Sequence, residues 1–226
     1  DNDGSGDYIR PGLGNDLLDF SDVATGFISV DYGFLDGSQT IDVTIDGAAN
    51  TGSVAYSGGD TDTFVDVANV LNAGFNVGGL EIRGTTGNDS FDLAPGSQQW
   101  MSLRMGDGVD TLTVNGAGQV RLDFRDATEG VEIDLAARTI AEDGFSNTET
   151  IGGTTSVFEV QGSEFDDMFL GDAGNNSYRY VGGNNDLDGG DGFDRLRYDR
   201  GTVAAVNINA EAGTATGTLI AGGSFT

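Results

Sequence analysis

Three chemically versatile side chains are missing from this chain, which contains no cysteine, no histidine and no lysine. Without cysteine there are no disulfides, no thiolate nucleophile and no cysteine-ligated zinc. Without histidine and lysine there is no Ser-His-Asp triad, no histidine metal site and no Schiff base. The composition therefore excludes the most familiar catalytic arrangements.

Positive charge and long apolar segments are also scarce. Ten arginines stand against 37 acidic residues, which gives a formal net charge of −27 over 226 residues. No basic stripe is present that could bind nucleic acid, and an anionic membrane surface would repel the chain. No apolar run approaches the roughly 18 residues that span a bilayer. We therefore expect no nucleic-acid partner and no membrane insertion.

Proline is nearly absent, with two residues, whereas glycine is abundant, with 38. Short Val/Ile/Leu/Phe segments between Gly/Asn/Asp clusters predict many short strands. Apolar and polar residues alternate over 40–46, 120–124 and 131–135, so we expect the apolar members to face a core and the polar members to face water. Phe64–Leu71 fits either one or two helical turns or a strand with a loop, which leaves 63–75 open between helix and strand.

The most informative motif is Gly189–Arg197, which reads GGDGFDRLR. It matches every fixed position of the pattern G-G-x-G-x-D-x-U-x, where U is a large apolar residue, and this pattern winds a parallel β-roll around calcium ions. The glycines permit tight turns, the aspartate offers a carboxylate to a metal between successive turns, and the apolar residue points inward from a short strand. Looser copies occur at Gly4–Arg10, Gly12–Phe20, Gly84–Leu93, Gly106–Val114, Gly162–Leu170 and Gly171–Tyr180.

These segments, with G-N-D-x-U cores such as Gly14–Leu18 and Gly87–Phe91, resemble the RTX, or haemolysin-type calcium-binding, repeat family. The resemblance implies an all-β chain folded as a right-handed parallel β-roll or β-helix solenoid with calcium-binding glycine/aspartate-rich turns. It also implies secretion from a Gram-negative bacterium, usually by a type I exporter, and folding on extracellular calcium. It is closest over 162–198, looser over 1–20 and 84–114, and without a nonapeptide over 21–83 and 115–161.

Some copies depart from the family pattern. Asn176 stands where aspartate is expected, and Phe165-Asp166-Asp167 replaces Gly-Asn-Asp. We expect those turns to bind calcium weakly or not at all.

The net charge gives an independent reason to expect metal. Carboxylates crowded into Gly/Asn/Asp turns repel one another, and divalent cations relieve that repulsion. Each calcium cancels two charges, so about six to eight ions would remove roughly half of the excess. We therefore expect several Ca²⁺ ions as cofactors.

By pattern position, seven carboxylates and the glycines of the same turns are the candidate metal site. Oxygen-only ligation suits a hard cation rather than zinc or copper. The alternative is that some of these aspartates only cap turns through Asx hydrogen bonds. A second alternative, an EF-hand-like loop at 1–7, lacks the glutamate at position 12 and obvious flanking helices. The candidates are Asp7, Asp16, Asp89, Asp110, Asp167, Asp186, Asp194, Gly12, Gly14, Gly87, Gly108, Gly190 and Gly192.

A longer repeat overlies the nonapeptides. The segments beginning at Leu18, Leu122 and Leu196 each lead into a second apolar segment, near Val43, Val131 and Val206 respectively. We expect each calcium turn to feed a strand pair, with rungs that bury their apolar side against neighbouring rungs. Residues 1–226 are expected to be one module with possible sub-units 1–83, 84–161 and 162–226, excised from a larger protein.

Two sets of residues suggest a recognition surface. Arg179 and Arg197 are 18 residues apart, two nonapeptides, so they should lie side by side on neighbouring strands roughly 4.8 Å apart. Tyr178 and Leu196 would then point inward. Local Asp188, Asp191 and Asp199 could neutralise the arginines, or the pair could bind a glycan carboxylate or sulfate. Arg195, Arg200, Tyr180 and Tyr198 lie close by in the sequence.

The only tryptophan, Trp100, lies in an alternating segment. If Met101, Leu103 and Met105 face inward, Trp100 and Arg104 face outward and form a platform for sugar stacking. The opposite register buries Trp100 and exposes two methionines. The sequence leaves both registers open.

Together these observations predict a calcium-binding, non-catalytic module of a large secreted bacterial protein, extracellular or at the cell surface. Its role would be extracellular glycan binding or calcium-driven folding and spacing. An adhesin repeat segment and a polysaccharide lyase or epimerase are the alternatives. Paired carboxylates could hydrolyse glycosides, but each acidic cluster has a calcium or turn explanation. We expect a monomer whose partners are calcium and an extracellular polysaccharide.

Overall fold

The chain is all-β in the part that the computed structural model describes. Short strands form nearly all of the regular structure, and most neighbouring strands run parallel. This confirms the expected fold class at that level. The described residues are 6–23, 26–35, 37–72, 78–199, 203–209, 214–219 and 224–225.

The chain forms two compact units. The first comprises residues 1–122 and 149–157, and the second comprises residues 123–148 and 158–226. The single module with sub-units at 1–83, 84–161 and 162–226 stays a prediction.

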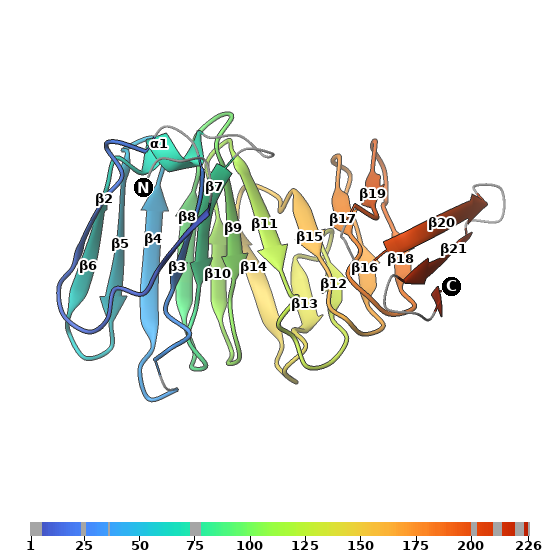
Figure 1. Ribbon diagram of the computed structural model, residues 1–226, viewed down its shortest axis with the longest axis horizontal. Helices are drawn as coiled ribbons and strands as arrows, with labels where there is room; N and C mark the ends of the chain where they lie inside the picture. The colour runs from blue at the N-terminus through green and yellow to red at the C-terminus, as the bar shows by residue number, and fades with distance from the viewer. Residues whose placement is uncertain are drawn as a thin grey trace. The chain divides into compact units, whose positions relative to one another are not determined.

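One sheet of the first unit is wholly parallel (Figure 1). Its registers place Ile28, Leu80 and Met101 opposite one another, and all three are buried. The row is therefore a continuous apolar stripe on one face of the sheet. The strands, in spatial order, are β1 (Gly6–Ile9), β3 (Gly26–Asp31), β7 (Gly78–Arg83), β9 (Trp100–Arg104) and β11 (Gln119–Asp123).

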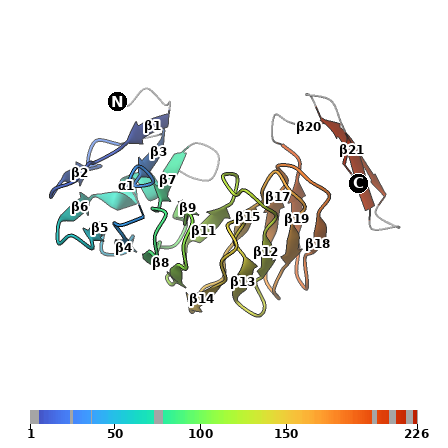
Figure 2. The same cartoon turned by 90° about the horizontal axis from the view of Figure 1, so that it is seen from below.

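The second sheet of this unit combines parallel ladders with an antiparallel meander. β4, β5 and β6 pair antiparallel in succession, while β8 joins β4 in parallel and β2 joins β6 in parallel. Figure 2 shows this sheet as a layer facing the first one. In spatial order the strands are β14 (Glu149–Gly153), β10 (Thr111–Val114), β8 (Ser90–Ala94), β4 (Ile41–Asp46), β5 (Thr51–Tyr56), β6 (Thr61–Val65) and β2 (Leu17–Asp19).

The segment left open between helix and strand contains both. β6 ends at Val65, and the short helix α1 (Val67–Leu71) follows. Val67, Val70 and Leu71 are buried, so one apolar side of the helix faces the interior. Residues 73–75 of that prediction lie outside the described residues.

The second unit contains the nonapeptides in their most regular form. β15 (Glu159–Gln161), β17 (Ser177–Arg179) and β19 (Arg195–Arg197) form one parallel ladder. The other ladder runs from β13 (Thr139–Glu142) through β12 (Glu132–Asp134) and β16 (Met168–Leu170) to β18 (Asp186–Asp188). β20 (Val203–Asn209), β21 (Thr214–Leu219) and β22 (Ser224–Phe225) form a separate antiparallel sheet.

From residue 162 to residue 197 each nine-residue unit consists of a six-residue turn and a three-residue strand. Successive strands alternate between the two ladders, so strands two units apart become neighbours. Tyr178 pairs with Leu196 and Arg179 with Arg197. The predicted 18-residue register is confirmed, because six turn residues reverse the chain and three strand residues carry one apolar side chain inward.

The longer repeat differs from its prediction. We expected each turn to feed a strand pair, but the first copy feeds the three-stranded meander β4-β5-β6 and the third feeds β20-β21-β22. The second copy contributes the antiparallel pair β12-β13, as expected. In the first copy, the third strand returns the chain to the direction in which it entered the meander.

The predicted alternation is confirmed in β4, where Ile41, Val43 and Ile45 are buried while Asp42 and Thr44 are exposed. It is only half right in β11. Val120 and Leu122 are buried as expected, but Arg121 and Asp123 are buried too. The expectation that these polar residues face water was wrong, because other side chains cover that face of the sheet.

Candidate metal centre

The glycine–aspartate turns have a common internal contact. The glycine at the first position of a turn lies against the side chain at the sixth. A Cβ on Gly84, Gly162 or Gly189 would stand 2.7, 2.3 or 2.5 Å from a carboxylate oxygen of Asp89, Asp167 or Asp194 respectively. Only glycine leaves room for the carboxylate to fold back over its own turn, which explains the pairing of these two residue types in the motif.

Asp89 closes its turn through backbone and hydroxyl donors. Its Oδ2 accepts the Thr85 N–H at 2.6 Å, and its Oδ1 accepts the Thr85 hydroxyl at 2.9 Å. Oδ1 also accepts the N–H of Ile41 from β4 at 2.9 Å. Burial raises the pKa of Asp89 to about 6, although these hydrogen bonds act in the opposite direction. A cation beside the carboxylate would favour its charged form.

Asp167 has the same arrangement but more donors. Oδ1 accepts the Val131 N–H at 3.0 Å and the Ser163 hydroxyl at 2.5 Å, and Oδ2 accepts the Ser163 N–H at 3.0 Å and the Tyr178 hydroxyl at 2.6 Å. A carboxylate has about four acceptor positions. Asp167 is therefore saturated by protein donors. This favours the turn-capping interpretation for this residue.

Side chains also tie each turn to the next one in the stack. The sixth residue of one turn donates its N–H to the side chain at the sixth position of the following turn: Asp89 to Asp110 at 2.8 Å, and Asn176 to Asp194 at 2.9 Å. In the reverse direction, the Asn175 amide oxygen accepts the Phe193 N–H at 2.9 Å. Asx hydrogen bonds thus act between turns as well as within them.

The Asp194 carboxylate accepts fewer hydrogen bonds than those of Asp89 and Asp167. Among the described residues its only side-chain hydrogen bond is the one from Asn176. Backbone oxygens of turn 171–176, its neighbour in the stack, lie close to the same loop. A Cβ on Gly190 would stand 2.5 Å from the Asp172 carbonyl oxygen, and one on Gly192 would stand 2.4 Å from that of Gly174. The donor set between turns 171–176 and 189–194 is therefore carboxylate and carbonyl oxygen, the chemistry that calcium prefers.

Asp16, which directly precedes β2, has a different environment. Its N–H donates to Oδ1 of the fully buried Asp62 at 3.0 Å. The Asp16 Oδ2 atom is buried and has no hydrogen-bond partner among the described residues. Asp62 accepts the Tyr32 hydroxyl at 2.9 Å and the Tyr56 hydroxyl at 2.6 Å. Burial and the nearby Asp62 raise the pKa values of both tyrosines, so they remain neutral donors.

Two predicted ligands are not at the sixth position of a described turn. Asp7 lies within β1, opposite Ile28, because that strand already begins at Gly6. Asp186 is the first residue of β18, opposite Met168, and is exposed. Its turn ends one residue earlier, at Asn185, whose amide oxygen accepts the Asp167 N–H at 2.9 Å. A shift of one residue moves a side chain to the other face of a strand.

The predicted turn glycines fall into two groups. Gly12, Gly14, Gly108, Gly190 and Gly192 have positive φ angles, which side chains rarely adopt. Gly87 does not, but a Cβ there would stand 3.0 Å from Thr40 and 3.1 Å from the Gly37 carbonyl oxygen. Within the described part of the chain, no three carboxylates gather closely enough to form a metal cluster of their own. A bound calcium would therefore depend on backbone carbonyls for most of its ligands.

The arginine pair lies side by side as predicted, and acidic side chains neutralise it. Arg179 Nε lies 3.3 Å from Asp199 Oδ1, and Arg197 Nη2 lies 2.5 Å from Asp199 Oδ2. Arg197 Nη1 also lies 2.8 Å from Oε2 of the buried Glu159. Burial lowers the pKa of Arg197, but its hydrogen bonds to Asp199 and Glu159 outweigh that effect and raise it.

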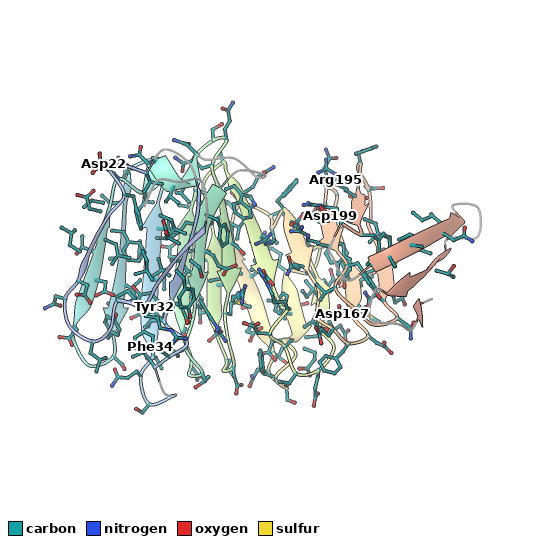
Figure 3. The ribbon with its side chains drawn as sticks, in the orientation of Figure 1. Asp22, Tyr32, Phe34, Asp167, Arg195 and Asp199 are labelled. Atoms are coloured by element: carbon teal, nitrogen blue, oxygen red, sulfur yellow. The ribbon has the colours of Figure 1, made fainter. Side chains whose placement is uncertain are left out.

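Of the three acids expected to neutralise the arginines, Asp199 does so. Glu159, which also pairs with Arg197, was not among those expected. Figure 3 labels Asp199 and Arg195 close together, with Asp167 toward the opposite ends of the strands. Arg195 is exposed, and Arg200 lies outside the described residues. The Tyr180 and Tyr198 rings pack 5.1 Å apart. Burial raises the pKa of Tyr180 to about 12.

The sugar-stacking platform at Trp100 is not present, because Trp100 is only 3% exposed. Met101, Leu103 and Met105 are buried as well, so neither proposed register describes the strand fully. Trp100 packs against Phe27 and beneath the Arg121 guanidinium, 4.9 Å from the ring centre. Arg104 pairs with Glu81 at 3.3 Å. The second face of this sheet is thus covered by its own aromatic and ion-paired side chains.

No protein-family model matches the chain, and a search of curated proteins returned no significant match. Within the described residues, no helix is long and apolar enough to cross a membrane. The RTX resemblance therefore rests on the nonapeptides themselves.

Proposed function

We propose that the chain is a calcium-binding, non-catalytic module of the RTX type, folded as a right-handed parallel β-roll, from a large protein secreted by a Gram-negative bacterium. The observation that carries the proposal is the pair of stacked turns 171–176 and 189–194. There, glycines lie against backbone carbonyl oxygens while Asp194 retains acceptor capacity. Secretion and the bacterial source are proposed from the family resemblance alone.

Calcium would be held by the Asp194 carboxylate and by carbonyl oxygens of the glycine-rich turns. The ion would supply charge neutralisation and a link between consecutive rungs. The chain's own residues already align those rungs through the Asn176–Asp194 hydrogen bond and the β17–β19 ladder. Calcium binding would add to this alignment and stabilise the folded state by mass action.

Folding and spacing are the roles that the surface favours over glycan binding. The two features that suggested a glycan site are engaged within the protein, since Asp199 and Glu159 pair with the arginines and Trp100 is buried. We propose no catalytic role, and calcium-driven ordering of a spacer is the function that these contacts support best.

Thermal unfolding in chelator and in millimolar calcium tests the proposal. The chain is first unfolded and refolded in chelator, so that slowly exchanging ions are removed. We expect the melting temperature to rise by roughly ten degrees or more in calcium. An unchanged melting temperature would contradict calcium binding.

A matched pair of variants locates the ion. Asp194→Asn keeps a side-chain acceptor for the Asn176 N–H but removes the charge, whereas Asp186→Asn removes the same charge from an exposed strand position. We expect Asp194→Asn to raise the calcium concentration needed for half-maximal stabilisation about tenfold or more. We expect Asp186→Asn to change that concentration less than about twofold. Equal effects of the two variants would point to non-specific screening instead.

A further inference from the structure

The edge of β20 is open in the part of the chain that the structure describes. β20 pairs antiparallel with β21 on one side, and no described strand pairs with its other side (Figure 1). Ile208 on this strand is 63% exposed. An unpaired strand edge with an exposed aliphatic side chain is a template for another strand.

Two other hairpins contain a strand that corresponds to β20, and in both of them the corresponding edge is paired. Three hairpins share one spacing, because in each of them four residues separate an Asp or Asn from the Thr with which it pairs. The closing pairs are Asp46 with Thr51, Asp134 with Thr139 and Asn209 with Thr214. β4, β12 and β20 are therefore equivalent first strands.

In the first two hairpins, the first strand is covered by the strand of a nonapeptide that follows it in the chain. β4 pairs in parallel with β8, placing Val43 opposite Phe91. β12 pairs in parallel with β16, placing Ile133 opposite Phe169. As a result Ile45 and Ile133, which directly precede the closing residues as Ile208 does, are 0% and 1% exposed.

The turn that precedes the covering strand also contacts the first strand. The carboxylate at its sixth position accepts a backbone N–H at the start of that strand: Asp89 from Ile41 at 2.9 Å, and Asp167 from Val131 at 3.0 Å. The glycine at the first position of the same turn makes room for that carboxylate. In both hairpins, the nonapeptide therefore contacts the first strand in two ways, through its own strand and through the aspartate of its turn.

We propose that the open edge of β20 is a docking site for a glycine–aspartate nonapeptide of the kind formed by residues 162–170. The docked strand runs parallel to β20 and covers Ile208, and its sixth-position aspartate accepts an N–H from the start of β20. The partner is defined by chemistry: a first-position glycine, a sixth-position aspartate and an inward aromatic or aliphatic residue at the eighth. The proposal does not depend on calcium binding.

Extending the full chain tests the proposal directly. A copy of residues 154–170, the segment that leads from β14 to β16, is appended after residue 226. Hydrogen exchange of the β20 amides is then compared with that of the unextended chain, in calcium and in chelator. We expect β20 exchange to slow by about a hundredfold, with β12 exchange unchanged as the internal reference.

The control extension carries Gly162→Val and Asp167→Ala in the appended copy only. It has the same length but lacks the glycine that leaves room for the carboxylate and the aspartate that accepts the N–H, so we expect no slowing of exchange at β20. Unchanged exchange with the native extension, or equal slowing with both extensions, would overturn the proposal. Concentration-dependent self-association of the unextended chain that protects β20 would also overturn it, because the occupant would then be a second copy.

Discussion

At the scale of single residues, the turn aspartates serve a purpose that does not require a metal. Asp89 and Asp167 hold their own turns closed and anchor a neighbouring strand. Hydrogen bonds to charged groups contribute roughly 1.5–3 kcal/mol each when buried. The motif therefore combines two functions, because the glycine that permits carbonyls to approach a cation also lets the carboxylate fold over its turn.

The first-position glycine can be tested in the first unit. A Cβ on Gly84 would stand 2.0 Å from the Met105 carbonyl oxygen and 2.7 Å from the Asp89 carboxylate. We expect Gly84→Ala to lower the free energy of unfolding by roughly 1–3 kcal/mol or more, measured by denaturant titration. Gly58→Ala is the control, because its Cβ would meet only the end of the Gln39 side chain at 3.4 Å. A similar loss in both variants would refute the steric explanation.

The buried Asp31 predicts an acid dependence of stability. It accepts hydrogen bonds from Tyr8, from Arg10 Nε at 3.0 Å and from the Gly33 N–H at 2.8 Å. Burial raises the pKa of Asp31, but these donors together with Arg83 outweigh it and lower the pKa. A carboxyl group with a lowered folded-state pKa stabilises the fold fully above about pH 4 and loses that contribution as the pH falls through the folded value.

We therefore expect Asp31→Asn to cost roughly 1–3 kcal/mol at pH 7 and progressively less toward pH 2–3. The measurement is the difference in unfolding free energy between the two proteins at each pH, which removes the acid response that they share. A difference that stays constant across this range would mean that the charge of Asp31 does not contribute.

At the scale of elements, the three hairpins show how one local sequence gives different burial. The apolar residue before each closing pair is the same in all three, an isoleucine, yet Ile45 and Ile133 are buried and Ile208 is exposed. Hairpin formation needs only the turn and the adjacent pairs. Burial needs the parallel strand that comes from elsewhere in the chain.

This difference gives a matched pair of substitutions. We expect Ile133→Ala to lower the unfolding free energy by about 2–5 kcal/mol, because it leaves a cavity against Phe169. Ile208→Ala removes the same atoms from an exposed site and should change it by less than about 0.5 kcal/mol. Chemical denaturation of the two variants measures both, and a comparable loss at Ile208 would show that β20 is covered in solution.

At the scale of the whole molecule, the arginines in described strands all lie in the wholly parallel ladders and not in the other sheets. Six of the ten arginines lie in strands of the ladders formed by β7, β9, β11, β17 and β19. They pair there with buried acids such as Asp31, Glu81 and Glu159. The described strands of the other sheets carry no arginine. Most of the −27 charge therefore lies in turns and on strand faces without a cationic side chain, where calcium is the proposed counterion.

The sequence by itself determined the features that depend on short spacings. The 18-residue register of Arg179 with Arg197 and the alternation in β4 follow from local glycine, aspartate and aliphatic positions. Such patterns are set by backbone geometry within about nine residues, so they can be read without knowing the remainder of the fold.

Only the tertiary structure decided the features that depend on distant partners. Glu159 reaches Arg197 across 38 residues, Phe27 and Arg121 bury Trp100, and Tyr178 helps to saturate Asp167. The one-residue shift that excludes Asp186 from its turn is set by the hydrogen bond between Asp167 and Asn185. No local pattern encodes these contacts, because each depends on which face of a sheet another segment covers.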